Sequence, residues 1–217
     1  MIKKINFYSI AYFVACLVSL FFIDVNASIT EMIVKISALI FLSFLYLSST
    51  KTINYFYLFV LMNSIASDTF LIFDDDFLML GTILLLANRI LYIIISRRAL
   101  SDINPKNSLS YLLPSLLLFV IIYELLKPYL QQISLSFLLI GISSAIVIGL
   151  SFMNYMNNMN EKNKLFFFGM LLIVTADVLI AINKFLDYHL AYVIIYTSMY
   201  YVARYFICQS MIEETNR

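Results

Sequence analysis

The sequence predicts an all-α integral membrane protein, a polytopic bundle of about eight transmembrane helices that forms one domain over residues 1–217. Hydrophobic residues make up 63% of the chain and charged residues 12%, about half of the charged share of a typical soluble domain. Apolar segments follow one another almost without interruption from Ile5 to Ile212. A soluble fold of this length could not bury so much apolar surface, whereas a bilayer can cover it.

Eight apolar segments are close to the ~20 residues that cross the hydrocarbon core as a helix. Backbone groups have no water to bond in lipid, so each segment is expected to be a helix; barrel strands would be shorter and would alternate in polarity. The expected helices are residues 5–23, 32–49, 53–73, 77–96, 109–127, 133–155, 165–185 and 190–212. Three polar links are expected between them: an acidic turn at Asp74–Asp76, the long stretch Arg97–Ser108, and Asn157–Lys164.

The first segment also has features of a secretory signal peptide. Lys3 and Lys4 precede it, and the small-residue pattern at 25–27 follows it. Its apolar run over residues 5–23 is longer than the 7–15 residues of a signal region. We therefore expect a retained membrane anchor.

The distribution of basic residues predicts the orientation. With the N-terminus in the cytoplasm, the cytoplasmic side receives Lys3, Lys4, Lys51, Arg97, Arg98, Lys106, Lys162, Lys164 and Arg217. The outer side receives Lys127 and Lys184, with Lys35 inside the second helix. Basic residues mark cytoplasmic loops, so we expect a multi-pass protein with both termini in the cytoplasm.

Charge and residue types exclude several function classes. The net charge of +1 gives no basic excess for nucleic acid, so membrane lipids are the expected surroundings. No Cys/His cluster, Gly-rich phosphate loop or Ser/His/Asp set is visible, and we expect no metal and no cofactor. Cys16 and Cys208 lie in apolar runs and are expected to be buried thiols. Asp74–Asp76 is interpreted as a solvated turn rather than a calcium site, and His189 as an interfacial residue.

Four ionisable residues stand out at membrane depth within the predicted helices: Asp68, Arg89, Asp177 and Arg204. An ionisable side chain at membrane depth costs a few kcal/mol or more, so it usually faces the bundle interior and has a partner. We expect all four to point into one shared cavity. Amides accompany them, because Asn63 precedes Asp68 and Asn88 adjoins Arg89.

The four residues also repeat in order. Each half of four helices carries an aspartate on its third helix and an arginine on its fourth, with the similar contexts IASD and VTAD. Two parallel four-helix repeats would explain this, and coincidence would explain it too. Pairing within the halves, Asp68 with Arg89, is possible but stretched. Crossed pairing, Asp177 with Arg89 and Asp68 with Arg204, is equally open.

Four stretches resemble the YhhN/lysoplasmalogenase family: SIASDTFLIF, LMLGTILLLANRILY, FFFGMLLIVTADVLIAINKF and YYVARYFICQS. The stretch VKISALIFL, with Lys35, resembles the family's lysine near the start of the second helix. The resemblance implies an eight-helix membrane protein of similar length. It also implies hydrolysis of the vinyl-ether bond of a lysophospholipid substrate, which releases a fatty aldehyde and a glycerophospho-head-group.

The resemblance places the family's acidic positions on Asp68 and Asp177, as catalytic residues. One carboxylic acid would protonate the vinyl carbon, and the other carboxylate would stabilise the cation or deprotonate water. Arg89, Arg204 and Lys35 would bind the substrate phosphate, with Asn63 and Asn88 as further substrate-binding residues. The chain departs from the family pattern at both arginines, where the family often has His or Gln, and at Ser67, where it often has Gly. Arginine stays charged and cannot shuttle protons.

Two other function classes remain open. A small carrier or lipid translocator is consistent with the repeat and the midplane charges, although scarce glycine and proline argue against broken helices. A non-enzymatic membrane protein could use the buried charges as structural ion pairs. A closed, lipid-accessible pocket joining Asp68 and Asp177 would favour the hydrolase, and a through-going polar path would favour the carrier.

We predict that a cysteine introduced at Asn104 reacts only from the cytoplasmic side, because the basic Arg97–Ser108 link should stay inside. The links at Asp74–Asp76 and Lys184–His189 should face outward. Labelling of intact cells with a membrane-impermeant maleimide measures this, and a cysteine at Asp187 serves as the outward control. External labelling at position 104 would contradict the topology.

Overall fold

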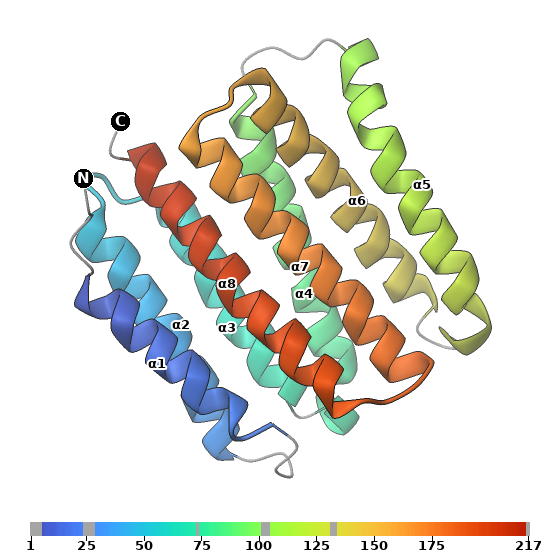
Figure 1. Ribbon diagram of the computed structural model, residues 1–217, viewed down its shortest axis with the longest axis horizontal. Coiled ribbons are helices and arrows are strands. Elements are labelled where there is room, and N and C mark those ends of the chain that lie inside the picture. The colour runs from blue at the N-terminus through green and yellow to red at the C-terminus, as the bar shows by residue number, and fades with distance from the viewer. Residues whose placement is uncertain (1–5, 24–28, 73, 101–104, 131–133, 216–217) are drawn as a thin grey trace. The chain divides into compact units, whose positions relative to one another are not determined.

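The computed structural model describes residues 6–23, 29–72, 74–100, 105–130 and 134–215 (Figure 1). These ranges form eight α-helices and contain no strand, which confirms the predicted all-α class. The helices are α1 (Phe7–Leu20), α2 (Ile29–Ser49), α3 (Tyr55–Ile72), α4 (Asp74–Arg98), α5 (Pro105–Leu130), α6 (Ser134–Asn157), α7 (Glu161–Phe185) and α8 (Leu190–Thr215).

The polar links are shorter than predicted because three helices begin earlier. The prediction of an acidic turn at Asp74–Asp76 was wrong, since these residues are the first three of α4. Acidic residues are common in the first turn of a helix, so the triplet is as compatible with a helix start as with a turn. α5 begins at Pro105, inside the predicted Arg97–Ser108 link, and proline suits a first helical turn because its missing N–H has no intrahelical partner there.

The link before α7 is short for a different reason. Asn160 is the N-cap, and its side-chain oxygen accepts a hydrogen bond from the Asn163 backbone N–H at 2.8 Å. Glu161 in the first turn adds a favourable charge. The predicted Asn157–Lys164 run is therefore largely helical, because short polar side chains that suit loops also suit helix starts.

Several apolar helices indicate a membrane protein. Within the described ranges, five are long and apolar enough to cross a bilayer: Ile29–Ser49, Met79–Arg98, Ser110–Leu130, Ser134–Asn157 and Glu161–Phe185. α1 is apolar but shorter, and its 14 residues rise by only about 21 Å at 1.5 Å per residue. The number of crossings and the side of each terminus remain predictions.

The chain divides into two compact units, Met1–Leu84 with Met211–Arg217 (unit 1) and Leu85–Ser210 (unit 2). The division lies inside α4 rather than in the link that follows it. Arg89 therefore belongs to unit 2, whereas Asp68 belongs to unit 1. The expectations of a single domain and of two four-helix repeats remain predictions.

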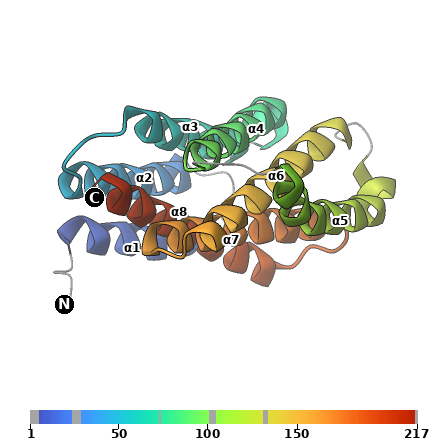
Figure 2. The same cartoon turned by 90° about the horizontal axis from the view of Figure 1, so that it is seen from above.

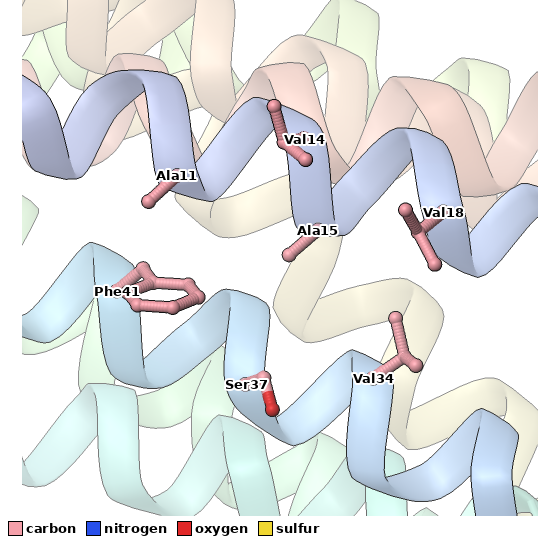
Figure 3. Close-up of a pocket in the computed structure, with 7 residues that line it drawn as sticks. All are labelled: Ala11, Val14, Ala15, Val18, Val34, Ser37 and Phe41. Carbon is pink, nitrogen blue, oxygen red and sulfur yellow. The ribbon is translucent and has the colours of Figure 1, made fainter.

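In unit 1, α1 and α2 lie side by side and enclose a shallow groove of about 310 Å³ (Figure 3). Ala11 and Ala15 of α1 face Ser37 and Phe41 of α2, and the small alanine and serine side chains leave space between the two helices. The lining is otherwise apolar and contains no titratable group. The groove thus has no side chain for acid–base chemistry.

In unit 2, α5, α6 and α7 follow one another side by side (Figures 1 and 2). Gly149 of α6 lets that helix approach the backbone of α5. A Cβ at this position would lie 3.1 Å from Leu112 Cα and 3.2 Å from the Tyr111 carbonyl oxygen. Leu126 and Ala181 are buried in the cluster that joins α5 to α7.

Gly169 of α7 likewise allows that helix to approach α8 closely. A Cβ there would lie 2.7 Å from Ile207 Cγ1 and 3.0 Å from the Ala203 carbonyl oxygen. The backbone oxygen cannot move aside as a side chain can. This close approach fixes α7 against the middle of α8, the two helices that carry Asp177 and Arg204.

We predict that Gly169→Ala lowers the stability of the folded protein by about 1–3 kcal/mol, the usual cost of overpacking. The clash with α8 should outweigh the gain of about 1 kcal/mol in helix propensity. Thermal unfolding in detergent micelles measures the change. Thr175→Ala, at an exposed position of the same helix, should stay within about 0.5 kcal/mol of the wild type. A more stable Gly169→Ala protein would contradict the close packing.

Candidate active site

A buried ion pair links α4 to α7 within unit 2. The Arg89 guanidinium donates from Nη2 to Asp177 Oδ2. The arginine side chain is 2% exposed and the aspartate side chain 17%. This is one half of the crossed pairing that the sequence left open.

The arginine also contacts a third helix. Arg89 Nε donates to Ser144 Oγ of α6 at 3.2 Å. Ser144 is 3% exposed, so its hydroxyl gives the buried guanidinium a second polar neighbour away from water. A buried charge needs such additional hydrogen bonds, because ion pairing alone seldom offsets the loss of hydration.

The aspartate in turn contacts α8. The Tyr200 hydroxyl donates to Asp177 Oδ1, so the two carboxylate oxygens have donors from two different helices. The guanidinium carbon of Arg204 lies 5.5 Å from the centre of the Tyr200 ring. Tyr200 and Arg204 are four residues apart and share one face of α8, at a distance typical of a cation–π contact.

The arrangement defines an aspartate that forms a buried ion pair with a guanidinium and accepts a hydrogen bond from a tyrosine hydroxyl. A group of this kind can stabilise a developing cation, or accept a proton through a remaining lone pair. An acid that donates a proton must first carry one, and the ion pair with Arg89 uses the carboxylate form. Asp177 therefore has the geometry of a base or an electrostatic stabiliser.

The structure places the other predicted residues as follows. In unit 2, Asn88 is 4% exposed and adjoins Arg89 on α4, and Arg204 is 9% exposed. In unit 1, Asp68 is half-buried on α3. The Asn63 amide donates to the Leu84 carbonyl oxygen at 3.0 Å and thus ties α3 to α4. The predicted shared cavity would combine residues of both units and remains a prediction.

Lys35 forms an ion pair within its own helix. Its Nζ lies 2.6 Å from Glu31 Oε1, one turn earlier on α2. The side chains are 22% and 14% exposed, so both are partly shielded. The lysine that the sequence suggested as a phosphate ligand thus has a carboxylate neighbour.

Sequence reasoning did not select Tyr200 and Ser144 as site residues. For Tyr200 a signal was present, because it precedes Arg204 by one helical turn. For Ser144 the signal was weak: it belongs to a serine pair in an apolar helix, and serines there commonly bond the backbone of the preceding turn. Ser143 does so, donating to the Ile140 carbonyl oxygen at 2.8 Å.

Among the described residues, no group of three or more His, Cys, Asp or Glu is placed to hold a metal ion. Cys16 and Cys208 are buried thiols, as predicted. His189 lies at the α7–α8 link with Nε2 3.0 Å from Asp187 Oδ2, and both side chains are largely exposed.

The apolar helices indicate a membrane protein, and the buried polar cluster gives it an ion pair between two of those helices. The chain belongs to the YhhN family, whose family model matches residues 30–211. The matched range contains Arg89, Asp177 and Tyr200. Neither a curated protein nor a solved structure matches the chain.

We predict that Asp177→Asn destabilises the protein by about 3–5 kcal/mol, because it leaves the Arg89 guanidinium buried without its counter-ion. Combining it with Arg89→Gln should recover part of the loss. Thermal unfolding in micelles measures both changes.

The matched control for this prediction is Glu124→Gln on α5. It breaks an exposed pair with Lys127, 3.6 Å apart, and should change stability by less than about 1 kcal/mol. If Asp177→Asn were as stable as the control, the ion pair would contribute nothing to the stability of the folded protein.

Proposed function

We propose that this protein is a membrane-embedded hydrolase that cleaves the vinyl-ether bond of lysoplasmalogen-type lysophospholipids. The products would be a fatty aldehyde and a glycerophospho-head-group. Membership of the YhhN family supports the reaction class. The observation that carries the chemistry is a buried carboxylate, Asp177, held by Arg89 and Tyr200.

The reaction needs one acid and one base. Asp68, in its protonated form, gives its proton to the vinyl carbon distal to the ether oxygen, and an oxocarbenium ion forms at the neighbouring carbon. Water attacks that carbon, and Asp177 takes the proton that the water releases. The resulting hemiacetal collapses: the bond from carbon to the glycerol oxygen breaks, the hemiacetal hydroxyl loses its proton, and the glycerol oxygen gains one, which gives the aldehyde and the free glycerol hydroxyl.

The assignment of the base follows from the ion pair. Arg89 uses the charged form of Asp177, which suits a group that stabilises a cation and then accepts a proton. The acid role falls to Asp68 by residue type, because it is the other aspartate within the predicted apolar segments of the family match.

The two arginines take different roles in this scheme. Arg89 is 2% exposed and is bound to Asp177 and Ser144, so it orients the carboxylate. Arg204 is the arginine of unit 2 that we assign to the substrate phosphate, a task that suits a guanidinium. Of the two arginines that the family resemblance assigned to the substrate phosphate, Arg204 keeps this role in the scheme.

The same ion pair supports a second candidate, a non-enzymatic membrane protein whose buried charges join helices. Arg89 contacts α6 and α7 at once, as a structural tie would. Buried pairs of this kind are kept in some proteins for specificity rather than for stability. Turnover measurements distinguish the two candidates.

We expect purified protein to release fatty aldehyde from a lysoplasmalogen but not from the matching 1-alkyl lysolipid, which lacks the double bond that accepts the proton. Asp68→Asn and Asp177→Asn should each lower the rate by about 10²-fold or more, a typical share for an acid or base. Aldehyde release in micelles or nanodiscs measures this.

Glu124→Gln, at an exposed ion pair, is the control for this experiment and should keep the wild-type rate. A folded Asp68→Asn variant with undiminished turnover would remove the acid assignment. Absence of turnover in the wild type on any lysolipid would leave the structural candidate.

A further inference from the structure

Tyr200 is the one donor to Asp177, among the described residues, that carries no charge of its own. Its hydroxyl bonds Oδ1, while Arg89 bonds Oδ2. Each carboxylate oxygen can accept about two hydrogen bonds. One acceptor position on each oxygen therefore remains for another molecule.

The carboxylate needs more than one contact to hold a single orientation. The terminal torsion of aspartate is broad, because it joins an sp³ to an sp² carbon. The Arg89 contact joins one nitrogen to one oxygen, which leaves the plane of the group free to turn about that contact. A second donor on the other oxygen, from a different helix, fixes the plane.

Tyr200 is itself fixed at two places. Its hydroxyl is bonded to Asp177, and its ring is covered by the Arg204 guanidinium at 5.5 Å. Arg204 and Tyr200 lie on the same face of α8, and Gly169 brings α7 close to that helix. The position of the carboxylate on α7 therefore depends, through the Tyr200 ring and hydroxyl, on the position of α8.

We propose that Tyr200 is a positioning residue, which orients the Asp177 carboxylate so that a lone pair of Oδ1 faces the attacking water. The inference rests on the proposed hydrolase function for its kinetic consequence. Its geometric part, a hydroxyl that sets the carboxylate plane, does not depend on turnover. Tyr200 acts through Asp177 and does not touch the substrate in this role.

The test compares Tyr200→Phe with Tyr155→Phe. Both remove one hydroxyl from a tyrosine of unit 2 and keep the ring. Tyr155 stacks on Phe167 with ring centres 5.9 Å apart, so the control preserves its packing. We expect Tyr200→Phe to lower kcat by about tenfold or more with little change in KM, since a misplaced catalytic group affects the chemical step. Tyr155→Phe should leave both constants unchanged.

A second comparison separates positioning from packing. In the Asp177→Asn background, Tyr200→Phe should lower the residual rate no further, because residues that act through one another are not additive. An equal further loss in both backgrounds would overturn the positioning role. Loss of folded protein in Tyr200→Phe, but not in Tyr155→Phe, would assign the tyrosine to the scaffold and overturn it as well.

An infrared measurement tests the geometry without turnover. The carboxylate stretching band that disappears in Asp177→Asn should shift in Tyr200→Phe and stay in place in Tyr155→Phe. If the wild type cleaves no lysolipid but the band shifts, the proposed function fails while Tyr200 still sets the carboxylate. If the band does not move, the inference is wrong whatever the activity.

Discussion

A guanidinium buried in an apolar helical unit must have a counter-ion, and the polar structure of unit 2 is organised around that requirement. Arg89 is 2% exposed, and an isolated charge at such a position would be prohibitively costly. The cost is offset by Asp177 on α7 and Ser144 on α6, and Tyr200 connects the pair to α8. The helices α4, α6, α7 and α8 thus share one polar centre.

The same constraint governs the uncharged polar residues of the unit. Two of their side chains bond carbonyl oxygens of a neighbouring helix. Asn154 of α6 donates to the Ser96 carbonyl oxygen of α4 at 2.8 Å, and Ser210 of α8 donates to the Lys162 carbonyl oxygen of α7 at 2.8 Å. Buried polar groups need partners, and in an apolar bundle the backbone near helix ends supplies them. These bonds set the register of helices whose apolar surfaces could otherwise slide.

The ion pair that holds the unit together also limits its chemistry. A carboxylate bound to arginine is a good acceptor and a poor proton donor, so the acid in the proposed hydrolysis must be a different group. Under the proposed function, the same carboxylate oxygens of Asp177 join the helices and take part in the reaction. In this respect the site resembles pairs of carboxylates in glycoside hydrolysis, where unlike environments divide the acid and base roles.

Sequence by itself determined the all-α class, the approximate position of each helix and the polar residues worth attention. Hydrophobic runs separated by polar links are a strong indication of helices in lipid. Backbone N–H and C=O groups there must form hydrogen bonds within the protein, and few structures other than helices allow this. It misjudged helix starts at Asp74 and Pro105, because acidic residues and proline mark both turns and first helical turns.

Tertiary structure decided which charges meet. Arg89 pairs with Asp177, 88 positions away, and no local spacing encodes that choice. Tyr200 and Ser144 entered the site only once the helices were packed. A sequence pattern along one helix shows on which face a side chain lies. The residue that it contacts depends on which other helix packs against that face and on how the two helices are offset along their axes. That is decided by close contacts such as those at Gly149 and Gly169.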